Sequence, residues 1–174
     1  MKLYRHLENL PRGVTGSVVA WGNFDGFHKG HQAVVRRAAR AVVGDAASAD
    51  EEPLATVLLE SDAAVRVLNA RFRERDAPTN VLSFPAVAVP GAPDADGYLG
   101  DIILAFGVCR REAGDQDKPL AHHLSHLVIH GLLHLMGHDH QTDDEAEVME
   151  ARERTLLAGL GIDDPYRSIL DRDP

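Results

Sequence analysis

The feature that most constrains this chain is a long apolar segment, residues 121–136, in which histidines recur at helical spacing. Its apolar side chains cover most of the circumference of a helix, as is typical of a helix buried at the centre of a domain. They are Leu124, Leu127, Val128, Leu132, Leu133 and Leu135. Imidazole groups on a buried helix need partners, because an unpaired buried polar group costs free energy. The fold therefore has to provide those partners around this helix.

The segment ends in a histidine pattern, HGLLHLMGHDH, at residues 130–140. His130 and His134 are four residues apart and lie one turn apart on one face of a helix. Gly137 can adopt a positive φ, which ends the helix and turns the chain back so that His140 supplies a third nitrogen. Three protein ligands with an open position are typical of catalytic zinc. We therefore predict one zinc ion per chain; the alternative, surface histidines on an amphipathic helix, is disfavoured by the apolar flanks.

Other residues near this pattern have predicted supporting roles. His126 and His123 continue the histidine stripe toward the N-terminus, either as groups that contact metal ligands or substrate or as packed, hydrogen-bonded core histidines. Asp139 precedes the third ligand, and we expect it to orient His140. Gly131 stands where zinc proteases of the HExxH type carry their catalytic glutamate. A peptidase mechanism therefore lacks its general base at the expected position.

Composition indicates the class of protein. With 174 residues, the chain has the length of one domain, or of one domain with an appendage. A single cysteine, Cys109, excludes an internal disulfide and favours a reducing compartment, and neither a secretory signal nor a membrane span is apparent. We therefore expect a cytoplasmic protein. The net charge of −9 means that contact with a polyanion requires a local basic patch or a metal.

Strand-like and helical patterns alternate along the chain. Strands are predicted at residues 17–23, 54–59, 81–84 and 99–106, and helices at 30–43, 63–72, within 110–120, at 121–136 and from 143 to about 157. Glu60, Ser61 and Asp62 offer candidate N-caps, and Thr142 with Glu145 has the spacing of a capping box. We therefore predict an α/β (α+β) fold with a small mixed sheet of about four strands, packed with helices around the central histidine helix.

The histidine pattern closely resembles the HGxLHLxGYDH motif of the YbeY family, the metal-dependent endoribonucleases of rRNA maturation, with His138 in place of the usual tyrosine. LNARFRERDAPTNVLSFP (68–85) and LGDIILA (99–105) resemble that family's second and third blocks. The acidic DDEAEVME segment and a DPY near the C-terminus follow in the same order. The resemblance runs from about residue 35 to 167 and implies that residues 35–174 form a YbeY-like metallohydrolase domain.

The resemblance also implies a function. It points to a single-strand-specific, zinc-dependent endoribonuclease in 16S rRNA 3′-end maturation and ribosome quality control, which hydrolyses phosphodiesters with a metal-activated water. The implied partners are rRNA in the small ribosomal subunit and, as further candidates, ribosome-associated proteins, with neither DNA nor a membrane among them. The implied location is the cytoplasm.

Arg73 takes the place of the family's motif arginine. Phosphodiester hydrolysis needs a Lewis acid, an activated water and a cation for the charge that develops on phosphorus. We therefore predict that Arg73 and His130 are catalytic and that Arg71, Arg73 and Arg75 bind RNA phosphates. The alternative for the arginines is a solvated helix end, where positive charge complements the helix dipole.

The N-terminal 34 residues differ from that family. VVAWGNFDGFHKGHQAVV (18–35) resembles the start of the bacterial FAD synthetases (riboflavin kinase/FMN adenylyltransferases), whose HxGH motif would place His28 and His31 at nucleotide phosphates. No further nucleotidyltransferase motif follows. We therefore interpret residues 1–34 as an atypical arm, strand and helix start that replaces the family's usual first strand and helix, and not as an independent domain.

Three other functions remain open from the sequence. They are a zinc peptidase or other metallohydrolase, a nucleotidyltransferase supported by GNFDGFHKGH alone, and a metal-stabilised, ribosome-associated module without catalytic activity.

Overall fold

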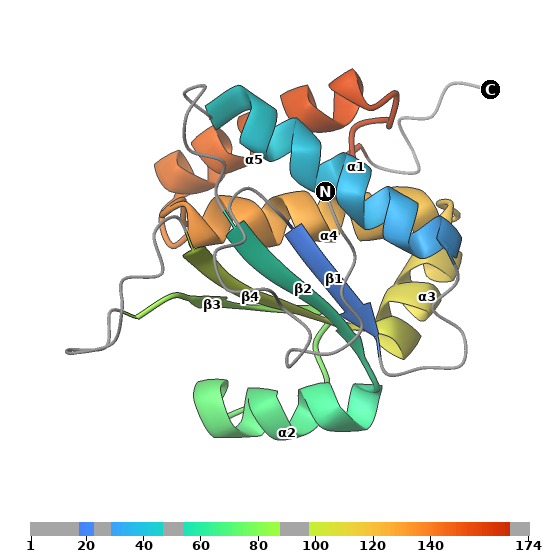
Figure 1. Ribbon diagram of the computed structural model, residues 1–174, viewed down its shortest axis with the longest axis vertical. Helices are drawn as coiled ribbons and strands as arrows, with labels where there is room; N and C mark the ends of the chain where they lie inside the picture. The colour runs from blue at the N-terminus through green and yellow to red at the C-terminus, as the bar shows by residue number, and fades with distance from the viewer. Residues whose placement is uncertain (1–17, 23–28, 47–53, 88–97, 168–174) are drawn as a thin grey trace.

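The computed structural model describes residues 18–22, 29–46, 54–87 and 98–167, and of residues 18–22, 29, 31–32, 43–46 and 54 it describes the backbone alone. In chain order the elements are β1 (Val18–Gly22), α1 (Lys29–Ala46), β2 (Leu54–Glu60), α2 (Asp62–Arg73), β3 (Val81–Pro85), β4 (Tyr98–Ala105), α3 (Phe106–Asp115), α4 (Leu120–Leu135) and α5 (Asp143–Gly159) (Figure 1).

The described strands form one mixed sheet in the order β1-β2-β4-β3. β1, β2 and β4 are parallel, and β3 is antiparallel to β4. This confirms the predicted α/β class with a small mixed sheet of four strands. β3 lies at one edge of the sheet, next to β4.

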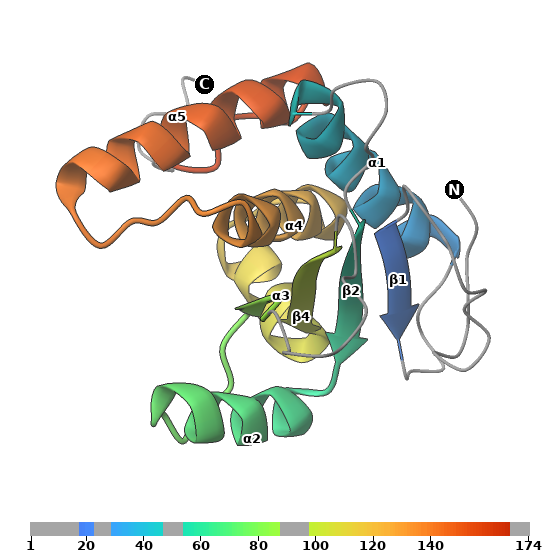
Figure 2. The ribbon, with the colours of Figure 1, turned by 60° about the vertical axis from the view of Figure 1, so that its left-hand side comes forward.

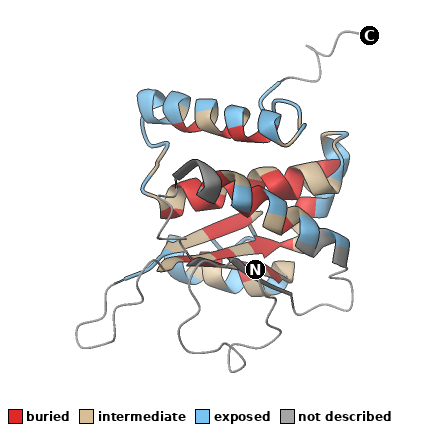
Figure 3. Ribbon diagram, turned by 45° about the horizontal axis from the view of Figure 1, so that its top comes forward, coloured by how far each residue is buried: buried red, intermediate tan, exposed pale blue. Residues whose placement is uncertain are grey.

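The helices cover the two faces of the sheet unequally. α4 and α1 lie side by side against one face, where α1 contacts β1, and α5 packs on α4, whereas α2 lies on the opposite face (Figures 1 and 2). Most side chains of α4 are buried (Figure 3), as its apolar sequence predicts. The main hydrophobic core therefore surrounds α4, and it is built from α1, α4, α5 and the inner face of the sheet.

Gly131 explains how α4 comes so close to the sheet. A Cβ at this position would lie 3.0 Å from two side-chain carbons of Ile102 on β4 and 3.1 Å from the Ser83 hydroxyl on β3. A larger side chain would push the helix off the sheet. Since position 131 faces packed side chains, a glutamate there has no room, which agrees with the predicted absence of an HExxH-type base.

The predicted helix ends agree with the structure at two caps. The Ser61 hydroxyl accepts a hydrogen bond from the Ala64 N–H at the start of α2. Thr142 and Glu145 form the predicted capping box at the start of α5. Among the described residues, no helix is both long enough and apolar enough to cross a bilayer.

One predicted boundary is wrong. Phe106 was expected to end a strand, with a short helix somewhere within residues 110–120, but α3 begins at Phe106. Its N-terminus is stabilised by Asp62, whose carboxylate accepts a hydrogen bond from the Val108 N–H at 3.0 Å. Gly107 provides the space, because a Cβ there would lie 2.6 Å from that carboxylate.

Candidate metal centre

Three histidines converge at the C-terminal end of α4. His130 and His134 lie on one face of the helix, and Gly137, with φ of +89°, turns the chain so that His140 joins them. One ring nitrogen from each histidine lies within 4.8 Å of the others. The Nε2 atoms of His130 and His134 are 3.1 Å apart. Two ligands of a tetrahedral zinc are roughly 3.3 Å apart when each Zn–N bond is about 2.0–2.1 Å. The cluster therefore has the dimensions of a metal site.

Hydrogen bonds on the far side of two rings set their orientation. Nδ1 of His130 donates to a Glu153 carboxylate oxygen at 2.8 Å, and Nδ1 of His134 donates to the His138 carbonyl at 3.0 Å. A carboxylate and a carbonyl only accept, so each ring carries its proton on Nδ1 and presents the Nε2 lone pair to the centre.

The charge state of His134 also suits a metal ligand. Burial lowers the pKa of His134, and the neighbouring His130 and His140 lower it further. A metal binds the neutral imidazole, not the imidazolium. The donor set, the tautomers and this protonation state together fit a zinc ion, whereas the identity of the ion stays a prediction.

Glu153 on α5 is the central outer residue of the site, and the sequence analysis missed it. Its side chain is 0% exposed and accepts hydrogen bonds from His126 and His130, each at 2.8 Å, and from the Tyr166 hydroxyl. Burial alone would raise the pKa of Glu153, but these three hydrogen bonds outweigh burial and lower it to about 2. The carboxylate therefore stays ionised and holds the ring of His130 in place.

A signal for Glu153 was present in the sequence. Thr142 marks the start of α5. The buried residues of this helix recur at helical spacing on one side; they are Met149, Glu153, Leu156 and Leu157. A glutamate in the apolar stripe of a helix needs a buried partner, because a lone buried charge is strongly disfavoured. Only the packing of α5 against α4 shows which partner it has.

The other predicted supporting residues separate into different roles. His126 contacts Glu153, so it reaches the candidate metal ligand His130 through that carboxylate. His123 is buried, and its Nε2 lies 2.8 Å from a carboxylate oxygen of Glu112. It is therefore a packed, hydrogen-bonded core histidine. Asp139 accepts a hydrogen bond from the backbone N–H of His140 at 2.8 Å, so it holds the loop backbone and not the imidazole ring.

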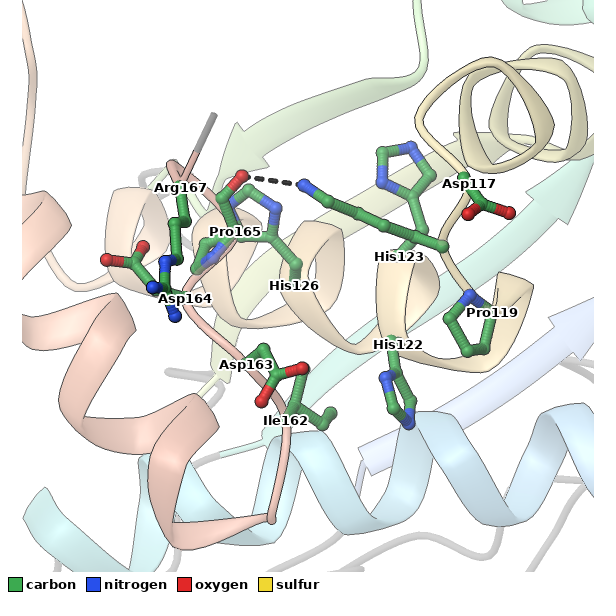
Figure 4. Close-up of a pocket in the computed structure, with 11 residues that line it drawn as sticks. Asp117, Pro119, His122, His123, His126, Ile162, Asp163, Asp164, Pro165 and Arg167 are labelled. Atoms are coloured by element: carbon green, nitrogen blue, oxygen red, sulfur yellow. Dashed lines mark hydrogen bonds between the residues drawn. The ribbon is translucent and has the colours of Figure 1, made fainter. Parts of the chain in front are cut away.

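A cavity of about 280 Å³ adjoins this network (Figure 4). His122, His123 and His126 of α4 line one wall, and residues 162–165 with Arg167 line another. The Lys118 ammonium donates to the Pro165 carbonyl at 2.6 Å and thereby ties the C-terminal segment to the start of α4. None of the three candidate metal ligands lines this cavity, and His126, which does line it, also contacts Glu153.

The three predicted RNA-binding arginines lie on a different element. Arg71, Arg73 and Arg75 are exposed at the C-terminal end of α2, on the face of the sheet opposite α4 (Figure 2). Among the described contacts, no hydrogen bond or ion pair joins them to the histidines. The C-terminal ends of α2 and α4 nevertheless lie at the same side of the molecule, on the left in Figure 1.

The nucleotidyltransferase-like motif lies mostly outside the described residues. His28 falls in that part of the chain, and of His31 the structure describes only the backbone, in the first turn of α1. The predicted strand and helix around this motif are present as β1 and α1. Their place in the fold is therefore known, and the segment stays interpreted as a strand and helix start.

Comparison with known proteins points to one family. Residues 26–161 match the family model described as "Endoribonuclease YbeY". A Nitrobacter hamburgensis protein named endoribonuclease YbeY is 52% identical over 142 residues, which cover 79% of this chain and 74% of that protein. A protein of the same name from Rhodopseudomonas palustris strain BisA53 is 55% identical over 140 residues, covering 78% and 80%.

A solved structure supports the fold independently. The solution structure of TM1509 from Thermotoga maritima is 21% identical to this chain. It superposes with a TM-score of 0.53 and covers 87% of this chain and all of that protein. At this identity the comparison supports the arrangement of helices and strands.

Proposed function

Because this chain belongs to the YbeY family of endoribonucleases, we propose that it is a zinc-dependent, single-strand-specific endoribonuclease of 16S rRNA 3′-end maturation and ribosome quality control. The observation that carries this proposal is the convergence of three imidazole nitrogens, two of them on rings oriented by Nδ1 hydrogen bonds. Three protein ligands with an open position are typical of zinc that takes part in catalysis.

A zinc ion bound there supplies Lewis acidity and activates water for attack on a phosphodiester. The residues of the chain contribute orientation and charge. Glu153 keeps the proton of His130 on Nδ1, so that Nε2 remains free to act as a ligand. The exposed guanidinium of Arg73 offers a cation for the negative charge that develops during hydrolysis, and Arg71 and Arg75 offer contacts for neighbouring phosphates.

The proposal includes partners and location. In a chain of net charge −9, the arginines at the end of α2 form a local basic surface for rRNA of the small ribosomal subunit. We place the protein in the cytoplasm, where that rRNA is processed, and assign it neither DNA nor a membrane as a partner.

The test combines metal analysis with cleavage of single-stranded rRNA by the wild type and by three variants. The wild type should hold one zinc per chain and cleave. His134→Ala should lose the zinc and the cleavage, whereas Arg73→Glu should keep the zinc and lose the cleavage. His138→Tyr is the matched control: it lies in the same turn, and only its backbone carbonyl bonds His134, so both properties should remain.

Each part of the proposal can fail separately. Full zinc in His134→Ala would refute the ligand assignment, and unchanged cleavage by Arg73→Glu would remove Arg73 from the reaction. If the wild type cleaves no RNA at any metal loading while His130→Ala loses stability, the protein is a metal-stabilised module without this activity. Casein hydrolysis by the zinc-loaded wild type would favour the peptidase alternative.

A further inference from the structure

Phe72, in the last turn of α2, is an aromatic residue that the fold leaves in solvent. It continues the stripe of Val65 and Leu68, which packs toward the sheet, yet its exposed fraction is 55%. A phenylalanine ring on the core-facing stripe of a helix normally gains hydrophobic stabilisation by burial. More than half of the Phe72 surface therefore stays accessible to a ligand.

The ring lies among groups that suit an unpaired nucleobase. It meets Phe84 of β3 edge-to-face, with ring centroids 5.1 Å apart and planes at 69°. The Arg71 guanidinium lies 5.3 Å from the centroid of Phe72. Arg73 and Arg75 are exposed directly beyond it in the chain. Proteins bind single-stranded nucleic acid with such surfaces, in which aromatic rings and guanidinium planes stack on bases and cations contact phosphates.

β3 lies between this aromatic pair and α4, the helix that carries His130 and His134. Ser83, the residue before Phe84, faces α4, where its hydroxyl would lie 3.1 Å from a Cβ at Gly131, next to His130. Side chains alternate along a strand, so Phe84 projects to the opposite face. Since β3 is at the edge of the sheet, an extended strand of RNA can pass over that edge from one face to the other.

We infer that Phe72, Phe84 and Arg71 form a stacking site for an unpaired base of the RNA substrate, next to the phosphate that Arg75 binds. This inference rests on the proposed endoribonuclease function and adds base recognition at a distance from the metal. RNA is favoured over a protein partner because the guanidinium groups around the ring complement phosphates. Bases within a duplex are stacked on each other, so the site also selects for single strands.

The test measures binding by fluorescence anisotropy with two oligonucleotides of equal length. One is a single-stranded RNA, and the other is the same sugar–phosphate strand with abasic riboses. Phe72→Ala should weaken binding of the RNA about 5- to 150-fold, the range that loss of one stacked base produces, and should leave binding of the abasic strand unchanged. Phe72→Tyr keeps the ring and should retain affinity.

Val67→Ala is the matched control, because Val67 is an apolar residue of the same helix with 65% exposure and lies outside the aromatic pair. It should bind both oligonucleotides as the wild type does. Circular dichroism of Phe72→Ala should equal that of the wild type, since the truncated ring is exposed.

Other outcomes overturn the inference. Unchanged RNA affinity of Phe72→Ala, or an equal loss on the abasic strand, would exclude stacking while the wild type still cleaves RNA and the proposed function stands. A change of mass in light scattering for Phe72→Ala, with RNA affinity unchanged, would show that the ring binds protein. A wild type that neither binds nor cleaves RNA would refute the proposed function itself, and the stacking site with it.

Discussion

The two faces of the sheet carry hydrophobic cores of different size. On the α4 face, a thick core from several elements encloses a helix that is mostly buried (Figure 3), and Glu153 pairs with two of its histidines, His126 and His130. On the α2 face, the fully buried cluster consists of Val65, Leu82 and Ala105, and arginines and Phe72 remain exposed. A metal site needs atoms fixed in position, whereas a surface that binds a flexible strand needs accessible groups. The two faces meet these different demands.

The largest expected effect is the loss of stability caused by a cavity in the core on either face of the sheet. Leu132 on α4 and Leu82 on β3 are both fully buried, so Leu→Ala removes the same atoms. We expect Leu132→Ala to lower the free energy of unfolding by about 4 kcal/mol and Leu82→Ala by about 2–3 kcal/mol, because the thin face can collapse around the cavity. Urea denaturation at equal metal content measures both. If Leu82→Ala lowers the free energy of unfolding as much as Leu132→Ala or more, the cores on the two faces do not differ in this way.

The next effect concerns the buried carboxylate. Glu153→Gln keeps the size of the side chain, but its amide cannot accept from both His126 and His130 as the carboxylate does. Loss of such an outer partner usually lowers metal affinity about 10- to 100-fold, and competition with a chelator measures it.

Glu150→Gln is the matched control for Glu153→Gln. Glu150 lies on the same helix and pairs with Arg154, and among the described contacts no hydrogen bond joins it to a histidine, so metal affinity should not change. If Glu153→Gln also binds metal as the wild type does, Glu153 contributes packing and not orientation.

A smaller effect is expected at the start of α2. Ser61→Ala removes the hydroxyl that accepts from the Ala64 N–H, and loss of such a cap costs about 1 kcal/mol of stability. Because α2 lies on the face without the histidines, metal affinity should be unchanged. Thermal unfolding and chelator competition on the same sample measure both quantities. A coupled loss of metal would show that the two faces are not independent.

The smallest effect at neutral pH concerns Cys109, which is fully buried and directs its thiol at the Asn80 carbonyl. Burial, and then the charge of Glu112, raises the pKa of Cys109 from 9.0 to about 12. The thiol ionises in the unfolded chain first, so the stability that it contributes is complete below pH 9 and is lost as the pH rises toward 12.

A thiol-reactive reagent tests this difference in accessibility. At pH 9, the folded protein should react slowly with Ellman's reagent, and the urea-unfolded chain should react at once. Rapid reaction of the folded protein would mean that the core around α3 opens readily.

Much of the fold could be predicted because its signals are local. The apolar periods located each strand and helix to within a few residues, and the caps at Ser61 and Thr142 lie where the sequence places them. The start of α3 could not be predicted, because its stabilising acceptor, Asp62, is 46 residues away from Val108 in the chain. Local sequence around Phe106 continues the apolar run of β4.

The same division holds at the candidate site. The sequence alone determined the grouping of His130 and His134 and the turn at Gly137, since these depend on residues within one or two helical turns. Only the tertiary structure decided that Glu153 orients His130 and that Phe72 remains in solvent beside Phe84. Helical spacing is set by the backbone itself, whereas burial and hydrogen-bond partners are set by which elements pack together.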